Sequence, residues 1–249
     1  MTGSRTTADG KTSNRMTVYE EVRRRIITGQ LGPGAIVSEN EIAVSMGLSR
    51  QPVREALLLL ANERMVEVRP QSGTYVSLID PDFVRQAQFI REALELTSLP
   101  IAVAKLTDED ANELREIVAG QADLAKHTPD DYYPFDERIH FNLLKIAGYE
   151  TAWTAISAAM GHLDRIRFFA AATGLRVREN VADEHRKIVD AAIARDTEAA
   201  RSELREHLRG VLADLDAMQT THPDFFEVDR LSNFRHGRTP RANLSGTAK

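Results

Sequence analysis

Apolar side chains recur every three to four residues over several stretches of the chain, which is the spacing of amphipathic helices. The first such stretch begins at Thr17, places Val18, Val22 and Ile26 on one helix face, and is expected to end at Gly29. Residues 1–15 come before it, mix Ser, Thr, Gly and Asn, and are expected to form a flexible arm.

Two shorter helices are predicted next. Ser38 is a good N-cap for the first, and Glu41 follows three residues later, as in a capping box. Gly47 is expected to end that helix. Ser49 can cap the following helix, and Pro52 lies near its first turn, where a missing N–H costs little.

Two runs with β-strand character follow, over residues 65–68 and 74–78, with the loop Pro70-Gln71-Ser72-Gly73 between them. They predict a β-hairpin with a short connection. The order helix, helix, tight turn, helix and hairpin is that of a winged helix-turn-helix, which is expected to span residues 16–79.

The rest of the chain is expected to be helical, after a domain joint at Asp80-Pro81. Pro100 and several Gly, Thr and Asp positions are turn signals that separate most of the predicted helices. The prediction is therefore a mainly α protein in which an antiparallel bundle of six or seven helices spans residues 83–220. Residues 222–249 lose apolar periodicity after Phe226 and are expected to be a disordered basic tail. The predicted helices are centred on residues 83–105, 108–126, 132–147, 151–171, 176–194 and 197–218.

Charge and composition narrow the function classes. The net charge of −5 divides into +1 for residues 1–80, −11 for residues 81–229 and +5 for residues 230–249. There is no cysteine, which excludes a zinc finger and a cysteine nucleophile. With no apolar run of about 20 residues and no apolar signal core, a cytoplasmic protein without a membrane segment is expected.

The start of the third helix carries side chains suited to reading DNA. Arg50 and Arg54 can each hold guanine O6 and N7 bidentately, Gln51 can read adenine, and Ser49 suits a phosphate. Gly73 in the hairpin can approach the DNA backbone closely because it has no side chain. The alternative is that these arginines form an ordinary solvated face.

This region resembles the GntR family of bacterial transcription regulators. The similarity rests on LSRQPVREAL (48–57) and RPQSGTYV (69–76), with Tyr19 to Gly29 before them. In that family the arginines matching Arg50 and Arg54 contact operator DNA. Two departures are Asn40, where some members carry arginine, and Met65, where glycine is common.

A second set of residues has the composition of a metal site. Asp136 and His140 are four residues apart and share a helix face, while His185 and His207 lie in the last two helices. One carboxylate and three imidazoles suit Zn²⁺, Ni²⁺ or Mn²⁺, with room for a water or a ligand oxygen. From spacing alone, Asp136 and His140 can equally be a surface pair.

Residues 83–218 resemble the FCD ligand-sensing domain of the FadR subfamily of GntR regulators. The similarity rests on FIREALEL (89–96), FDERIHFNLLKIAG (135–148) and the segment from Glu184 to Leu208. It implies that Asp136, His140, His185 and His207 bind a divalent metal. It also implies a small carboxylate effector, with Arg91 as its cationic partner and Arg165 and Arg167 as weaker candidates.

Together these features predict a homodimeric transcription regulator that acts as a repressor. A small acidic metabolite is expected to control its binding to double-stranded operator DNA. Dimerisation is expected because one recognition helix covers few base pairs. One alternative is a metal-dependent helical enzyme with an accessory nucleic-acid module. Glu137 and Glu184 adjoin metal candidates in sequence, but helix geometry is expected to point them elsewhere. Another is an architectural DNA binder, which leaves Asp136 and the histidines unexplained.

Overall fold

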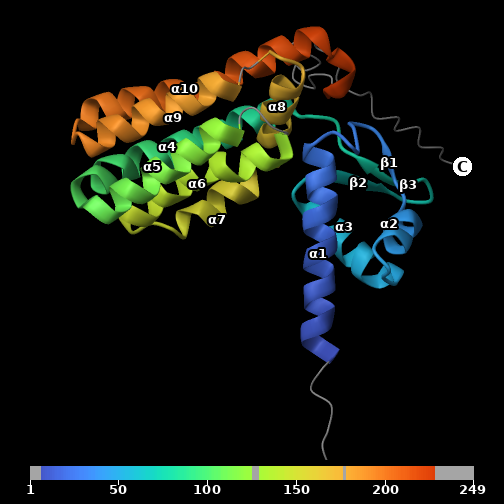
Figure 1. The fold of residues 1–249 in the computed structure, drawn as a ribbon. Helices are drawn as coiled ribbons and strands as arrows, with labels where there is room; N and C mark the ends of the chain where they lie inside the picture. Colours follow the sequence, from blue (N-terminus) through green and yellow to red (C-terminus); the bar gives the residue numbers. More distant parts are fainter. Residues whose placement is uncertain (1–6, 125–128, 176–177, 228–249) are drawn as a thin grey trace, which may run out of the picture.

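The structure, a computed structural model, describes residues 7–124, 129–175 and 178–227. Figure 1 shows a small winged-helix domain beside a larger domain built from helices, with α8 next to the joint between them. The mainly α fold expected from the sequence is confirmed, with one small sheet in the winged-helix domain. Among the helices that the structure describes, none is long and apolar enough to cross a bilayer.

The winged-helix domain begins with a helix longer than predicted. Residues 7–15 were expected to belong to a flexible arm, but the structure places them in α1. Once the buried face at Val18 and Val22 fixes the helix, each further residue adds one backbone hydrogen bond at little cost. Residues 1–6 of the expected arm lie outside the described residues. The elements of this domain are α1 (Thr7–Ile27), β1 (Ile36–Val37), α2 (Glu39–Ser45), α3 (Arg50–Asn62), β2 (Val66–Arg69) and β3 (Gly73–Val76).

Local sequence signals set the two helices of the helix-turn-helix. The Ser38 hydroxyl accepts a 3.2 Å hydrogen bond from the Glu41 backbone N–H, which confirms the predicted N-cap of α2. Ser49 occupies the N-cap position of α3 with extended backbone, although its side chain makes no capping bond. Gly47 ends α2 with a φ of 65°, a conformation that glycine adopts without strain.

The hairpin forms as predicted and gains a third strand. The strand order is β1-β3-β2, with antiparallel pairing throughout, and Arg69 lies opposite Gly73 at the turn. The two-residue strand β1 pairs Ile36 with Tyr75. A strand of this length is too short to show an alternation of apolar and polar residues in the sequence. The domain core gathers α1, α3 and the sheet around fully buried Val22, Ile26 and Leu60.

The second domain, called here the helical domain, contains seven helices among the described residues, within the predicted range. Two apolar clusters fill it, one between α4, α5, α6, α9 and α10, and one around α8. Asp80 caps α4, since its carboxylate accepts hydrogen bonds from the N–H groups of Asp82 and Phe83. The helices are α4 (Pro81–Lys105), α5 (Asp108–Leu124), α6 (Pro129–Ala147), α7 (Ala152–Ala159), α8 (Gly161–Ala172), α9 (Arg178–Ile193) and α10 (Thr197–Thr221).

Two helix predictions need correction. Pro100 was read as a turn signal, but it lies inside α4, which continues because Leu99, Ala102 and Val103 are buried in the core. The single helix expected over residues 151–171 is broken at Met160 into α7 and α8. At the break a Cβ on Gly161 would lie 2.5 Å from the Met65 sulfur, so a glycine lets α8 pack against the winged-helix domain.

The start of the expected disordered tail is also structured. Residues Pro223–Phe225 form a 3-10 turn after α10, and Phe226 is buried. The Ile79 N–H donates to the Phe225 carbonyl at 2.8 Å, and the Glu227 N–H donates to Ile79 at 2.9 Å. The apolar side chain of Phe226 therefore extends the fold past the end of periodicity. Residues 228–249 of the expected tail lie outside the described residues.

His162 joins the two domains through backbone groups. Its Nδ1 accepts a 3.2 Å hydrogen bond from the Asp80 N–H, and its Nε2–H donates to the Arg64 carbonyl at 3.0 Å. This pattern requires the neutral imidazole with its proton on Nε2. Burial lowers the pKa of His162 to about 4, and the nearby Arg165 acts in the same direction.

The neutral His162 should make the stability of the protein depend on pH. The unfolded chain takes up a proton near 6.5 and the folded chain only near 4, so the free energy of unfolding falls as the pH drops between these values. The loss from this group is about 2 kcal/mol between roughly pH 7 and pH 5. Urea titrations of the wild type and His162→Gln measure it as the difference between the two pH dependences. Parallel pH dependences would contradict the assignment.

Candidate sensor site and DNA-reading surface

Three imidazole rings from three helices converge in the helical domain. His140 comes from α6, His185 from α9 and His207 from α10, and all three are buried. The Nε2 atom of His185 lies 3.2 Å from that of His140 and 3.1 Å from that of His207. One ring nitrogen from each of the three lies within 4.8 Å of the other two.

Each ring is held from behind at its other nitrogen. His140 Nδ1 lies 2.7 Å from a Glu95 carboxylate oxygen, His185 Nδ1 lies 2.7 Å from the Gln121 amide oxygen, and His207 Nδ1 lies 2.8 Å from a Glu184 carboxylate oxygen. These partners accept hydrogen bonds, so they favour the tautomers with the proton on Nδ1. The three Nε2 lone pairs therefore face one another.

Facing lone pairs repel unless a cation lies between them, which makes this geometry suited to a metal ion. Ligand nitrogens about 2.05 Å from a tetrahedral zinc are about 3.3 Å apart, close to the 3.1 and 3.2 Å measured between the Nε2 atoms. Hydrogen bonding of the second ring nitrogen to a carboxylate or amide oxygen is also usual for metal-binding histidines. Burial lowers the pKa of His140 and lowers that of His207 well below 6.5, which keeps these two rings neutral.

Asp136 lies beside the three imidazoles, one helical turn before His140 on α6. Its Oδ1 atom is 3.8 Å from His185 Nε2 and accepts a 3.3 Å hydrogen bond from the Gln121 amide. Its Oδ2 atom contacts the guanidinium of Arg167 from α8. The carboxylate is fully buried, and the guanidinium of Arg167 beside it favours its charged form.

Arg91 is connected to this site through Glu95. Its Nε donates a 2.7 Å hydrogen bond to Glu95, whose other oxygen contacts His140. Burial opposes ionisation of Glu95, but His140 and Arg91 outweigh it and lower its pKa. The Nη2 atom of Arg91 is buried and has no hydrogen-bond partner among the described residues. The Nε atom of this guanidinium thus contacts the site through Glu95, while Nη2 offers a further donor.

The two remaining arginine candidates differ from each other. Arg167 pairs with Asp136 and so belongs to the site. Arg165 is fully buried, none of its three side-chain nitrogens has a hydrogen-bond partner in the described part of the chain, and burial lowers its pKa to about 9. We find no structural role for Arg165.

His140, His185 and His207, which the structure brings together, were candidates from the sequence, but the groups that orient them were not. Glu95 was detectable, since it lies four residues after Arg91 and therefore on the same helix face. Glu184 was expected to point away from the site. It does point away from the three Nε2 atoms, but its carboxylate on α9 contacts the Nδ1 atom of His207 on α10. Gln121 carried no recognisable signal, because one amide on a helix fits many roles.

The predicted DNA-reading side chains lie together on the outer face of the helix-turn-helix. Arg50 donates hydrogen bonds to the Asn40 amide oxygen at 3.3 and 3.0 Å, and Arg54 donates to Glu39 at 2.8 Å. Gln51 bonds to Glu55 at 2.7 Å. Both arginines of α3 are therefore exposed and tethered to α2, which points their guanidinium groups along the surface that the two helices share.

The hairpin presents its turn to solvent. Gly73 opens β3 with a φ of 116°, and a Cβ added there would meet nothing within 4 Å. Arg69 at the other side of the turn stacks over the Tyr75 ring with its guanidinium carbon 4.5 Å from the ring centroid. The turn thus combines an open backbone position with a fixed cation.

A winged helix-turn-helix followed by a helical domain defines a class of protein, the two-domain DNA-binding regulators. Residues 14–76 match the family described as "Bacterial regulatory proteins, gntR family", and residues 87–210 match the FCD domain. The chain belongs to the GntR family of DNA-binding transcriptional regulators, in the branch that carries an FCD domain.

Similar proteins agree with this assignment. A Streptomyces ambofaciens HTH-type transcriptional regulator in an unstable DNA locus is 41% identical over 89% of this chain and 92% of its own length. The Escherichia coli HTH-type transcriptional repressor RspR is 30% identical over 85% of this chain and 93% of its own. These relatives are regulators, so they do not support the alternative of a metal-dependent enzyme.

A solved structure shows the same fold. Escherichia coli McbR/YncC superposes with a TM-score of 0.70 over 82% of this chain and 98% of its own, at 20% identity. A GntR regulator from Rhodococcus superposes with a TM-score of 0.66, at 21% identity. At these identities the comparison carries the fold alone.

Proposed function

We propose that this regulator is a cytoplasmic repressor whose affinity for operator DNA is controlled by a small acidic metabolite bound at a divalent metal. The observation that carries the proposal is the convergence of three buried Nε2 lone pairs, each ring held in the coordinating tautomer. The relative RspR is a transcriptional repressor, which supports the direction of regulation.

In this proposal His140, His185 and His207 supply three nitrogen ligands and Asp136 supplies an oxygen. Zn²⁺, Ni²⁺ and Mn²⁺ all accept such a set. When bound, the metal supplies a Lewis-acidic position for an effector carboxylate. The residues of the chain do the rest: Glu95, Gln121 and Glu184 orient the rings, and Arg91 offers its unpartnered Nη2 to a second effector oxygen.

Changing one imidazole should remove the metal. His185 contacts both other Nε2 atoms, so His185→Ala should lower metal affinity by about 10- to 100-fold or more, leaving the purified protein without metal. The matched control is His222→Ala, because His222 is partly exposed at the end of α10. Elemental analysis checks the content, with about one metal per chain expected in wild type and control. Equal metal in all three proteins would contradict the site.

The same variants report on the effector. A ligand that binds the native state selectively raises the melting temperature. A small dicarboxylic acid that stabilises the metal-loaded wild type should leave His185→Ala unchanged.

For DNA recognition we propose that Arg50, Gln51 and Arg54 read base edges, while Ser49 and the wing at Gly73 contact the backbone. The first four of these residues are exposed in the first turns of α3, and Gly73 is exposed at the hairpin turn. The side chain of Arg54 is 58% exposed, which leaves its guanidinium accessible to a groove.

Arg54→Ala should therefore weaken operator binding by about 1–3 kcal/mol if the guanidinium reads a guanine. Arg209 on α10 is a matched control, since it is also 58% exposed and also paired with a glutamate. Binding is measured by titrating an operator that the wild type selects from a random duplex pool, and then random DNA. Equal losses on both DNAs would make Arg54 a phosphate contact instead.

We also propose that the protein acts as a homodimer joined through its helical domain, since two-fold dimers read palindromic half-sites. The helical domain is strongly acidic and so is poorly suited to contact DNA itself. Sedimentation of the full chain should give the mass of a dimer at micromolar concentration. A strict monomer there would contradict this part of the proposal.

A further inference from the structure

A chain of acidic and basic side chains connects the candidate metal site with the recognition helix. Arg167 contacts Asp136 at one end, and its Nη1 lies 3.4 Å from Oδ1 of Asp164. Oδ2 of Asp164 accepts a 3.1 Å hydrogen bond from Arg23 on α1. The Nε of Arg23 lies 3.8 Å from Glu63, the C-cap residue of α3. Charges of opposite sign thus alternate from the metal site to the winged-helix domain.

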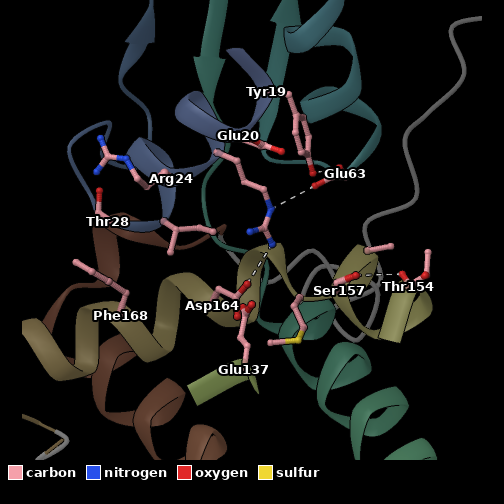
Figure 2. Close-up of a pocket in the computed structure, with 14 residues that line it drawn as sticks. Tyr19, Glu20, Arg24, Thr28, Glu63, Glu137, Thr154, Ser157, Asp164 and Phe168 are labelled. Atoms are coloured by element: carbon pink, nitrogen blue, oxygen red, sulfur yellow. Dashed lines mark hydrogen bonds and ion pairs between the residues drawn. The ribbon is translucent and has the colours of Figure 1, made fainter. Parts of the chain in front are cut away.

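The central members of this chain line a pocket of about 570 Å³ between the two domains. Figure 2 shows Glu63 on the side of the winged-helix domain and Asp164 on the side of α8. The ion pair of Arg23 with Asp164 joins the two sides, whereas that of Arg23 with Glu63 lies within the winged-helix domain. The Tyr19 hydroxyl donates a 2.6 Å hydrogen bond to Glu63, so α1 and α3 are tied together at the same place. A change in the position of α1 therefore reaches the end of the recognition helix.

Asp164 is the residue at which this series of ion pairs can rearrange. Its carboxylate is nearly buried, and it gives one oxygen to each of two arginines. The bond to Arg167 is long at 3.4 Å, because Arg167 also contacts Asp136. Charge-assisted N–H···O bonds are normally about 2.7–2.9 Å, and arginine binds carboxylates most strongly when it uses both oxygens. If Arg167 is released from Asp136, it can approach Asp164 closely and displace Arg23.

We propose that Asp164 is a coupling residue that shifts between Arg23 and Arg167 according to whether Asp136 is engaged by metal, and so sets how firmly α1 docks on the helical domain. This inference rests on the proposed metal site. Metal that takes the Asp136 oxygens frees Arg167 to bind Asp164, which loosens Arg23. An acidic effector that takes Arg167 returns Asp164 to Arg23. Each ligand thereby prefers one of the two arrangements, as a population shift requires.

Hydrogen exchange with Zn²⁺ alone as the probe tests the coupling. In the wild type, zinc should slow exchange around the three histidines and speed it, by about threefold or more, in residues 20–28 and 59–64. In Asp164→Asn, zinc should still protect the histidine segments but should leave residues 20–28 and 59–64 unchanged. Their exchange should already match the zinc-loaded wild type. Arg24→Gln is the control, because Arg24 pairs with Glu21 within α1 and should respond like wild type.

A second arm works without metal. Asp136→Asn removes the charge that holds Arg167, so it should speed exchange of residues 20–28 in the wild-type background and not in the Asp164→Asn background. If Asp164→Asn does not fold, Arg23→Gln breaks the same contact from the other side. The coupling is overturned if zinc or Asp136→Asn still alters the winged-helix segments of the Asp164 variant, or if Asp136→Asn has no effect on them in the wild type. If zinc protects no histidine segment, the proposed metal site fails and the second arm alone decides the coupling.

Discussion

The burial of α8 is the constraint on which the rest of the structure depends. Every residue from Gly161 to Ala170 is buried, although the segment includes His162, Asp164, Arg165 and Arg167. Buried charges are costly unless neighbours neutralise them. The surrounding elements supply partners for two of these charges: α1 gives Arg23 to Asp164, and α6 gives Asp136 to Arg167. Arg165 has no hydrogen-bond partner among the described residues. The same contacts that neutralise α8 therefore join the winged-helix domain to the polar site of the helical domain.

Much of the fold could be predicted because its signals are local. Ser38 and the glycine turns mark the helix-turn-helix, and the four-residue spacing of Asp136 and His140 fixes a shared face. The break at Met160 could not be predicted, because it depends on Met65 approaching Gly161 from another domain. The order at Phe226 also depends on packing that no local pattern records. The helical start of α1 follows from propagation of the helix beyond its buried part.

The candidate site divides in the same way. The three histidines are found from residue type and family resemblance, since few other side chains bind transition metals. Their orienting partners come from three different helices, α4, α5 and α9, and long-range pairings of this kind leave no periodicity in a sequence. Arg167 is an effector candidate from the sequence alone, and the structure adds its contacts with Asp136 and Asp164. Only the packed bundle shows that one arginine serves both neighbours.

The short parallel bridge between Ile79 and Phe226 has a consequence for modularity. A winged-helix domain and a helical domain that are joined at one point could be exchanged between regulators by a cut at Asp80. In this protein the chain returns after α10, and Phe226 lies against the joint. A chimaera cut at the joint alone would leave that strand contact mismatched. The unit to exchange is therefore the helical domain together with residues 222–227. The two domains are connected both by the covalent link at Asp80 and by the backbone bridge to Phe226.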